Sequence, residues 1–386
     1  MKLNVGSAAL VLVNSIPFSA NATQLLLGEN SFRYRYSEYS EDSIEEQNLA
    51  SGSVERYKIS IHQFSLEHVL NSDWALKLDA LSETMSGASP WYVVEEDSSL
   101  KQVMTGATIE ESRDDLSIRL FNIRDDSVIT IGTNFSIEND YKSIGATLGS
   151  SLSFNENNTT VISSVSHSID SIVPTDSELF PTRIDNAKKN VSSLSLGVAQ
   201  VINSTTLFSY TMSFSSSNGF LSDPYKLAQV GDQILADSRP SSREHFSHTM
   251  KFRHHLPSIN STIHFDYNHF ENDWAVKSQT FDFAFYWEPT YKWMIKPSFR
   301  FYEQSSAIFY NPVYDSERVD GFYSSDYRLS GFKARSSDIE ISRAFKDFNL
   351  QLIVTDYRSM NRDNNLSEHP GLVSFNRFTV GITFKY

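Results

Sequence analysis

The chain has 386 residues, a formal net charge of -14 at pH 7 and no cysteine. The acidic balance repels phosphate groups and argues against nucleic acid as a partner, and the lack of cysteine excludes a disulfide framework and thiol chemistry. Aromatic residues make up 13% of the chain, with 27 Phe and 18 Tyr, which is an ample supply for aromatic belts at a membrane interface.

The first element in chain order is a predicted secretory signal peptide at residues 1–22. Lys2 provides a short basic region, an apolar run follows at residues 10–13, and Ala-Asn-Ala at residues 20–22 fits the small-x-small cleavage rule. The alternative is a buried N-terminal strand. Residues 23–386 contain no run of about 18 apolar residues, so we expect no transmembrane helix, and they are predicted to form a single domain.

Strands follow along the rest of the chain, each predicted from alternating apolar and polar residues between turn signals. We count about sixteen, near residues 31–38, 54–69, 74–83, 112–122, 128–138, 144–154, 159–169, 188–202, 208–214, 243–256, 263–267, 281–287, 293–301, 327–345, 349–358 and 373–386. The last strand is the clearest, because every second residue from Phe378 to Tyr386 is apolar and the residues between them are polar or Gly. A terminal strand that ends on an aromatic residue is typical of outer-membrane β-barrels.

The connections between these strands alternate in length. The even-numbered ones are all short, at residues 71–73, 125–127, 155–158, 203–204, 257–260, 288–290 and 346–348. The odd-numbered ones include every long segment, at residues 41–53, 85–108, 171–185, 217–241, 304–326 and 359–372. Bacterial barrels have short periplasmic turns and long external loops. The sequence therefore predicts an all-β fold, a transmembrane antiparallel up-and-down β-barrel of about 16 strands, with a soluble exported β-protein as the alternative.

Two short turns predict the pairing of neighbouring strands and the direction of their side chains. A four-residue turn at 257–260 sets Phe252 opposite Phe265 and Met250 opposite Tyr267 on the lipid face, and Lys251 opposite Asp266 and Arg253 opposite His264 on the lumen face. A three-residue turn at 288–290 sets Asp282 opposite Lys296. Opposite charges then meet across strands on the face assigned to the lumen, as cross-strand pairing favours.

Four segments carry a resemblance to a known family: residues 85–93 (MSGASPWYV), 104–109 (MTGATI), 222–226 (SDPYK) and 325–330 (SDYRLS). In these segments the chain resembles the family known as domain of unknown function 3570, which is regarded as a group of envelope barrel proteins of Gram-negative bacteria. The resemblance covers nearly the whole mature chain. The family has no established substrate, so the resemblance implies a location but no functional residues.

The predicted external segment 85–108 is the strongest candidate site. It is unusually apolar for an exposed loop, so we expect it to fold into the lumen as a constriction or lid. Trp91 and Tyr92 are then candidates for stacking a ligand or gating the channel, and the alternative is a loop that only plugs and rigidifies the barrel. The other tryptophans lie near strand ends, and the expected membrane girdle comprises Trp74, Trp274, Trp287, Trp293, Phe384 and Tyr386.

A second candidate site is a charged wall on the predicted lumen face of the tenth to thirteenth strands. Its members are Lys251, Arg253, Lys292, Lys296 and Arg300, set against Asp266 and Asp282. One reading is a path for small anionic solutes, because a ring of one sign selects the opposite ion. The other is a salt-bridged wall that holds the shape of the barrel.

Other chemistry has less support in the sequence. The acidic external segments 41–46 and 95–97 suit either divalent cations that bridge to lipopolysaccharide or a solvated rim. Six of the ten histidines lie between residues 245 and 269, but no HExxH or Cys pattern accompanies them, so no metal and no cofactor is expected. No hydrolase, P-loop or dinucleotide motif occurs, and we expect no enzyme, with a barrel hydrolase as the lesser alternative.

Together these features predict an exported protein of the outer membrane of a Gram-negative bacterium. We expect a passive channel or a protein for small-molecule uptake or binding, narrowed by residues 85–108. The alternative is a non-conducting structural or assembly barrel that binds an envelope partner. The expected partners are outer-membrane lipid and lipopolysaccharide, the barrel-assembly machinery and a small anionic solute.

Overall fold

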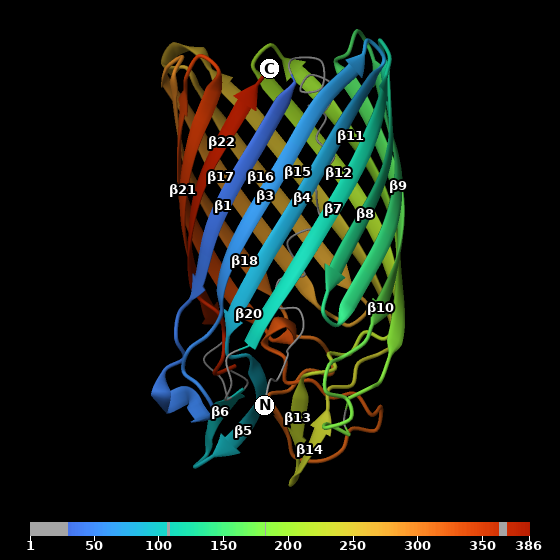
Figure 1. Ribbon diagram of the computed structural model, residues 1–386, viewed down its shortest axis with the longest axis vertical. Coiled ribbons are helices and arrows are strands. Elements are labelled where there is room, and N and C mark those ends of the chain that lie inside the picture. Colours follow the sequence, from blue (N-terminus) through green and yellow to red (C-terminus); the bar gives the residue numbers. More distant parts are fainter. Residues whose placement is uncertain (1–29, 106–108, 182, 363–368) are drawn as a thin grey trace.

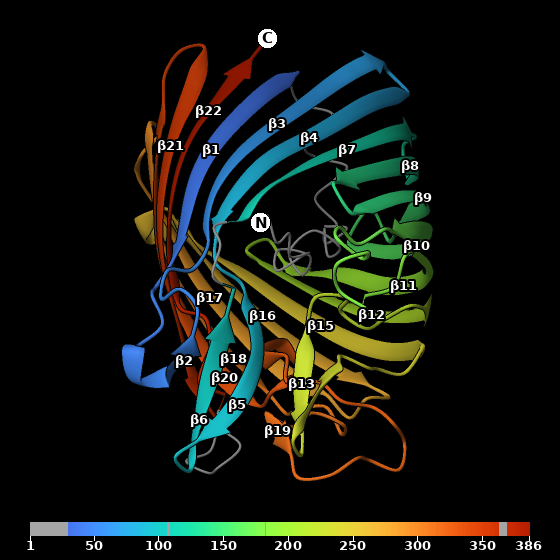
Figure 2. The ribbon, with the colours of Figure 1, turned by 60° about the horizontal axis from the view of Figure 1, so that its bottom comes forward.

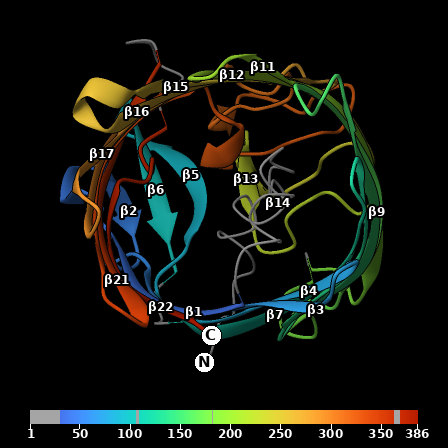
Figure 3. The same cartoon turned by 90° about the horizontal axis from the view of Figure 1, so that it is seen from above.

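The computed structural model describes residues 30–105, 109–181, 183–362 and 369–386, so the predicted signal peptide lies outside the described residues. Sixteen strands close into one antiparallel barrel (Figure 1). Seen along its axis, the barrel is a ring with further segments inside the outline (Figure 3). In the described part of the chain, no helix combines the length and the apolar character needed to cross a bilayer.

All sixteen predicted strands are confirmed, and most extend a few residues beyond their predicted ends. They are β1 (Ser31–Glu41), β3 (Lys58–Asn71), β4 (Trp74–Gly87), β7 (Ile109–Ile123), β8 (Ser127–Glu138), β9 (Tyr141–Phe154), β10 (Thr159–Ile172), β11 (Ala187–Asn203), β12 (Thr206–Gly219), β15 (Ser242–Leu256), β16 (Ser261–Asn272), β17 (Lys277–Thr290), β18 (Trp293–Gln304), β20 (Phe332–Ala344), β21 (Phe348–Asn361) and β22 (Phe375–Lys385).

The barrel closes between strands from the two ends of the described chain. β1 pairs with β22 along its whole length, with Tyr34 opposite Ile382 and Tyr36 opposite Val380. Each remaining barrel strand pairs with its neighbour in the chain order, which gives an up-and-down topology. Closure leaves no free sheet edge. Strands can lie in hydrocarbon only under this condition, because every backbone N–H and C=O group then has a hydrogen-bond partner.

An apolar belt surrounds the outside of the barrel. Phe283, Phe299 and Phe384 are 45%, 46% and 40% exposed, so they do not lie in a packed protein interior. Other exposed apolar members of the belt are Ile131, Leu148, Val165, Leu194, Met212, Phe252, Ile339 and Val354. Apolar surface of this extent requires a hydrocarbon environment, and the closed belted sheet is the architecture of an outer-membrane β-barrel.

The alternate residues of each strand face the lumen and are polar. On β9 to β12 they are mainly Ser, Thr and Gly, and hydroxyl pairs link neighbouring strands, such as Ser195 with Ser213 at 2.7 Å and Ser193 with Ser215 at 2.9 Å. On β15 to β22 and on β1 they include many charged side chains. The lumen therefore has one neutral, hydroxyl-rich wall and one charged wall.

The two ends of the barrel differ as the predicted loop lengths indicated. At the short-turn end the connections are residues 72–73, 124–126, 155–158, 204–205, 257–260, 291–292 and 345–347, and the chain terminus at Tyr386 also lies there (Figure 1). At the long-loop end they are 42–57, 88–108, 139–140, 173–186, 220–241, 273–276, 305–331 and 362–374. The long segments all fall at one end, and two tight turns, 139–140 and 273–276, accompany them.

The register predicted around the 257–260 turn is confirmed. Phe252 lies opposite Phe265, Met250 opposite Tyr267, Lys251 opposite Asp266 and Arg253 opposite His264. The prediction that Asp282 faces Lys296 was wrong, because the chain does not turn at 288–290: Pro289 lies in a β-bulge of β17, and the turn follows at 291–292. Asp282 instead lies opposite Arg300, and Lys296 faces Glu340 of β20.

The predicted aromatic girdle is only partly lipid-facing. Trp287 and Trp293 are 41% and 39% exposed near the short-turn end, as are Phe384 at 40% and Tyr386 at 62%. Trp74 begins β4 at the same end and is half-buried. The placement of Trp274 was wrong: it lies in the tight turn at 273–276 of the long-loop end, is 3% exposed and packs against Phe309 and Leu329.

Candidate functional site

The long connections fold together over the long-loop end of the barrel. We call the cap the segments 42–57, 88–105, 220–241, 305–331 and 369–374. It contains two small sheets, one of β2 (Leu49–Ser51), β5 (Pro90–Glu96) and β6 (Ser99–Met104), the other of β13 (Leu227–Val230), β14 (Gln233–Ala236) and β19 (Val313–Tyr314). Two 3-10 turns, η1 (Glu46–Asn48) and η3 (Tyr327–Leu329), also belong to it, whereas η2 (Pro257–Ile259) lies at the short-turn end.

Residues 85–105 of the candidate segment 85–108 form the end of β4 and the hairpin of β5 and β6, and residues 106–108 lie outside the described residues. The hairpin projects past the ends of the barrel strands (Figure 2) but lies within the ring when viewed along the axis (Figure 3). It therefore covers the mouth as part of the cap, and it is not a constriction deep among the strands. Trp91 and Tyr92 are half-buried, and Trp91 meets the edge of Phe180 at 6.5 Å between ring centroids.

The hairpin leaves the barrel through a position that only glycine suits. Gly87 ends β4 with a φ of +136°, a conformation that side chains with a Cβ rarely adopt. A Cβ there would lie 2.4 Å from the backbone oxygen of Arg56. The close approach of the backbone at Gly87 to the backbone at Arg56 lets residues 88–105 fold back across the mouth of the barrel.

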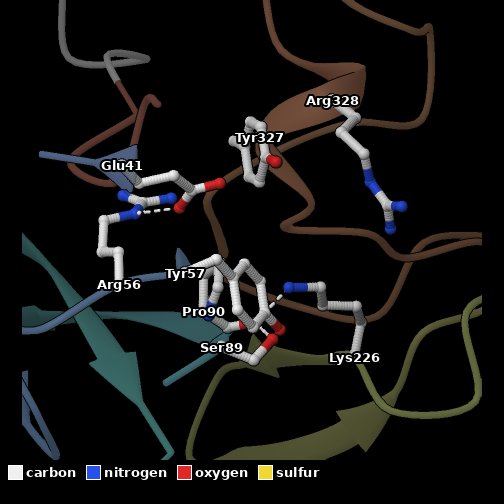
Figure 4. Close-up of a pocket in the computed structure, with 8 residues that line it drawn as sticks. All are labelled: Glu41, Arg56, Tyr57, Ser89, Pro90, Lys226, Tyr327 and Arg328. Atoms are coloured by element: carbon white, nitrogen blue, oxygen red, sulfur yellow. Dashed lines mark hydrogen bonds and ion pairs between the residues drawn. The ribbon is translucent and has the colours of Figure 1, made fainter. Parts of the chain in front are cut away.

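Three of the four segments that carry the family resemblance supply residues to the centre of the cap, namely Ser89 and Pro90, Lys226, and Tyr327 and Arg328 (Figure 4), and the fourth contacts it through Thr105. Lys226 donates through Nζ to the carbonyl oxygen of Pro90, and Ser325 Oγ donates to the carbonyl oxygen of Leu227 at 2.8 Å. The backbone N–H of Ser89 donates to Thr105 Oγ1 at 2.9 Å. Segments that lie far apart in the chain thus build one packed centre.

An ion-pair network lies at this centre. The carboxylate of Asp326 is fully buried and accepts hydrogen bonds from Arg328 Nε at 2.8 Å and from Arg239 Nη2 at 2.9 Å. Arg328 also donates to Asp223 at 2.6 Å, and Arg239 pairs with Asp237 at 2.7 Å. Burial by itself would raise the pKa of Asp326, but Arg328 and Arg239 hold it well below its usual range.

A second buried pair fixes the cap to the barrel closure. Arg56 Nε donates to Glu41 at 2.9 Å, and the two side chains are 2% and 4% exposed. Arg56 Nη1 also donates to the carbonyl oxygen of Gly371 at 3.0 Å. Glu41 ends β1, so Arg56 ties two connections, 42–57 and 362–374, to the seam where the first and last strands meet.

The cavity enclosed by these groups is small. Its volume is about 10 Å³, roughly the space of one water molecule. It is lined by Glu41, Arg56, Tyr57, Ser89, Pro90, Lys226, Tyr327 and Arg328 (Figure 4). Burial lowers the pKa of Lys226 to about 8. In the described part of the chain, the centre of the cap is therefore a polar contact between loops, and this cavity has room for about one water molecule.

His369 adds a neutral polar group to the same centre. It is 2% exposed, its Nε2 donates to the carbonyl oxygen of Ser325 at 3.0 Å, and its Nδ1 accepts from the backbone N–H of Gly371 at 2.9 Å. With one ring nitrogen donating and the other accepting, the imidazole is the neutral tautomer. Burial lowers the pKa of His369 to about 3.

The charged wall predicted from the sequence exists but is largely neutralised. Arg253 pairs with Asp266 at 2.9 Å, Arg300 with Asp282 at 2.5 Å, and Lys296 with Glu340 at 2.5 Å. Lys251 lies on the same wall, and the described residues place no carboxylate within salt-bridge distance of it. Lys292 was wrongly placed on the wall: it lies in the turn at 291–292, with its Nζ 5.3 Å from the ring centroid of Tyr291.

The sequence did not reveal a group of lumen arginines at the closure of the barrel. Arg33 donates to Thr383 at 3.3 Å, Arg35 to Gln351 at 2.9 Å, and Arg377 to Thr355 at 3.4 Å. Among the described residues, none of the three has a carboxylate within 4 Å. The available signal was the alternation of β1 and β22, which puts these arginines on the lumen face once the two strands are paired.

Comparisons with known proteins agree with this architecture. The family model for "Protein of unknown function (DUF3570)" matches residues 2–379, and no curated protein matches the chain. CdiB from Acinetobacter baumannii is similar in structure, with 8% identity and a TM-score of 0.51, covering 93% of this chain and 60% of that one. This likeness shows a shared barrel fold.

Two further solved structures are similar at lower scores. "Bacterial polysaccharide outer membrane secretin" has 9% identity and a TM-score of 0.47, covering 93% of this chain and 98% of that one. A BenF-like porin from Pseudomonas fluorescens Pf-5 has 8% identity and a TM-score of 0.44 with the same coverage.

Proposed function

The chain belongs to the DUF3570 family of proteins of unknown function, and from that starting point we propose that it is a capped channel for small hydrophilic solutes in the outer membrane of a Gram-negative bacterium. The long-loop end then faces the cell exterior, as in other bacterial barrels. The protein acts by diffusion and catalyses no reaction. The cap restricts entry from outside, and the lumen selects what passes.

The observation that carries the proposal is the lining of the lumen. The hydroxyl-rich wall of β9 to β12 and the charged wall of the remaining lumen both present polar side chains that can hydrogen-bond to water. Arg33, Arg35 and Arg377 have no carboxylate partner among the described residues, whereas Arg253, Lys296 and Arg300 have one each. Unpaired guanidinium groups raise the local concentration of anions, so we propose a preference for anionic solutes.

A second candidate function, a non-conducting barrel, is favoured by one observation. The buried ion pairs of Asp326 and Arg56 fix the cap in a closed arrangement, and the cavity between them is about 10 Å³. A barrel whose mouth stays closed would serve a structural role or bind an envelope partner. Conductance separates the two functions, because only the channel carries ions.

Replacing Arg33, Arg35 and Arg377 together with Gln is expected to shift ion selectivity towards cations. Each removed charge should change the anion-to-cation permeability ratio roughly sevenfold, because a unit positive charge about 7 Å from a hydrated ion favours an anion and disfavours a cation by ~0.6 kcal/mol each in a water-like dielectric. The measurement is the reversal potential of single channels in planar bilayers under a salt gradient.

The matched control for this experiment is Arg343→Gln. Arg343 also lies on a barrel strand, but its guanidinium packs against Trp293 at 5.0 Å on the lipid-facing side, so selectivity should not change. An unchanged reversal potential in the triple variant would remove the arginines from the mechanism. A wild-type protein without current would favour the non-conducting barrel.

A further inference from the structure

Three carboxylates gather at the rim of the long-loop end, outside the centre of the cap. Glu111 lies near the start of β7, Glu138 ends β8, and Asp140 lies in the tight turn that leads into β9. Arg113 lies opposite Glu138 in the register, so Glu111 is the next lumen-facing residue along β7. One ligand oxygen from each carboxylate lies within 4.8 Å of the others.

All three side chains are withdrawn from water. Glu111 is 7% exposed, Glu138 7% and Asp140 4%. Both carboxylate oxygens of Glu111 and the Oδ1 of Asp140 are buried and have no hydrogen-bond partner among the described residues. A buried carboxylate oxygen without a partner costs several kcal/mol, so such a group, directed into a cluster of acids, indicates a missing positive ligand.

Arg113 does not supply that charge to Glu111 or Asp140. Arg113 bonds most closely to Asp115 at 2.5 Å, and its other contacts are to Glu83 at 3.6 Å and to Glu138 at 3.9 Å. No ion pair joins it to Glu111 or Asp140 in the described chain. Glu111 and Asp140 therefore have no ion-pair partner among the described residues, and carboxylates this close cannot all be ionised without a cation or a shared proton.

We propose that Glu111, Glu138 and Asp140 bind a divalent cation of the calcium type. Carboxylate oxygens are the ligands that hard cations prefer, and Ca²⁺ takes them at 2.3–2.6 Å in a flexible geometry. The three ligand oxygens lie within 4.8 Å of one another, which is close enough for one ion of this size to contact all three. A carboxylate that binds through both oxygens would account for the two free oxygens of Glu111.

The proposed ion would link the barrel wall to the loops above it. Asp140 uses its other oxygen to accept a hydrogen bond from the hydroxyl of Tyr225, and its backbone oxygen accepts from the N–H of Val173 at 2.7 Å. Tyr225 in turn accepts from the backbone N–H of Thr175 at 3.1 Å. Binding of Ca²⁺ would therefore fix the position of Asp140 and, through it, two connections of the long-loop end.

The test is a titration of the full chain, folded in detergent and freed of metal with EDTA. Terbium(III) is the probe, because Tyr225 beside Asp140 can transfer excitation to a bound lanthanide, and CaCl₂ should displace it. We expect one saturable site per chain. Glu111→Gln should weaken Ca²⁺ binding at least tenfold while the protein still shows a heat-dependent shift in gel mobility.

Glu95→Gln is the matched control, since Glu95 is an exposed acid of the cap and its loss should leave the affinity within about twofold of wild type. Asp140→Asn provides a second variant if Glu111→Gln does not fold. A wild-type chain that binds no Ca²⁺ at 10 mM, or a folded variant with wild-type affinity, would overturn the proposal and leave a shared proton as the explanation of the cluster.

Discussion

Replacing Asp326 with Asn is expected to release the cap from the mouth of the barrel. The carboxylate is fully buried and accepts from both Arg239 and Arg328, whose side chains are 10% and 26% exposed, so its loss leaves two largely buried guanidinium groups short of negative charge. Removing one partner from a buried pair costs roughly 3–5 kcal/mol. Asp223 and Asp237 still offset part of the charge, which places the expected cost near ~3 kcal/mol.

The measurement is limited proteolysis of the folded protein, followed by mass spectrometry of the cap segments. A cost of ~3 kcal/mol corresponds to about a hundredfold increase in the population of the open cap, and cleavage tracks that population when opening is fast. If the protein is a channel, its conductance should rise in the same variant. The barrel itself should still shift in gel mobility only after heating, because its strands do not depend on Asp326.

Asp320→Asn is the matched control for this variant. Asp320 lies in the same connection, 305–331, and also pairs with an arginine, but its partner Arg318 and the carboxylate itself are 32% and 41% exposed. Exposed ion pairs contribute about 0–1 kcal/mol. Equal cleavage rates for the two variants would show that the buried network does not hold the cap closed.

The barrel was predictable because its physical requirement repeats along the chain. Each strand must place apolar side chains in lipid and polar ones in the lumen, so the alternation from Phe378 to Tyr386 recurs sixteen times with the same meaning. The errors arose where a local signal was ambiguous. Pro289 was interpreted as part of a turn but lies in a bulge. Trp274 was included in the girdle because a tryptophan near a strand end has the same sequence appearance whether it faces lipid or packs inside the cap.

The cap could not be predicted because its loops have no repeating pattern. The contact of Lys226 with Pro90 joins residues 136 positions apart, and that of Arg328 with Asp223 joins residues 105 apart. The two residues of each contact lie in different long connections, and only the closed barrel brings those connections together at the long-loop end. Barrel closure likewise brings together Arg35 and Gln351, 316 positions apart, so the unpaired lumen arginines become visible only when β1 and β22 are paired. The four segments that resemble the family indicated an envelope location for the protein, but they did not show which loops contact one another.

Acidification from pH 6.5 to pH 4.5 is expected to loosen the cap through His369. Burial lowers the pKa of His369 to about 3 in the folded cap, whereas an exposed histidine titrates near 6.5. The open state therefore binds more protons between these values, so the stability of the closed cap is complete above pH 6.5 and falls as the pH decreases. The loss is at most ~1.4 kcal/mol per pH unit, or about 2–3 kcal/mol at pH 4.5.

Asp326 and Lys226 keep their charges over this interval, whereas burial raises the pKa of Asp237 in the same network. The pKa of Asp326 stays well below its usual range and that of Lys226 is about 8, so the first remains ionised and the second protonated. The part of the acid sensitivity that belongs to the imidazole arises because it cannot take up a proton at Nδ1 without losing the hydrogen bond from the N–H of Gly371, and a His369 variant separates this part from that of Asp237.

Hydrogen exchange of the backbone amides in residues 324–330, corrected for the intrinsic effect of pH, measures this loosening directly. In wild type the protection should fall by roughly 30- to 150-fold between pH 6.5 and pH 4.5, the equivalent of about 2–3 kcal/mol. In His369→Asn the amide side chain can donate and accept as the imidazole does but does not titrate, so its protection should be nearly independent of pH. A variant as acid-sensitive as wild type would assign the response to another group, whereas a flat profile would show that one neutral, doubly bonded imidazole determines how firmly the mouth is closed.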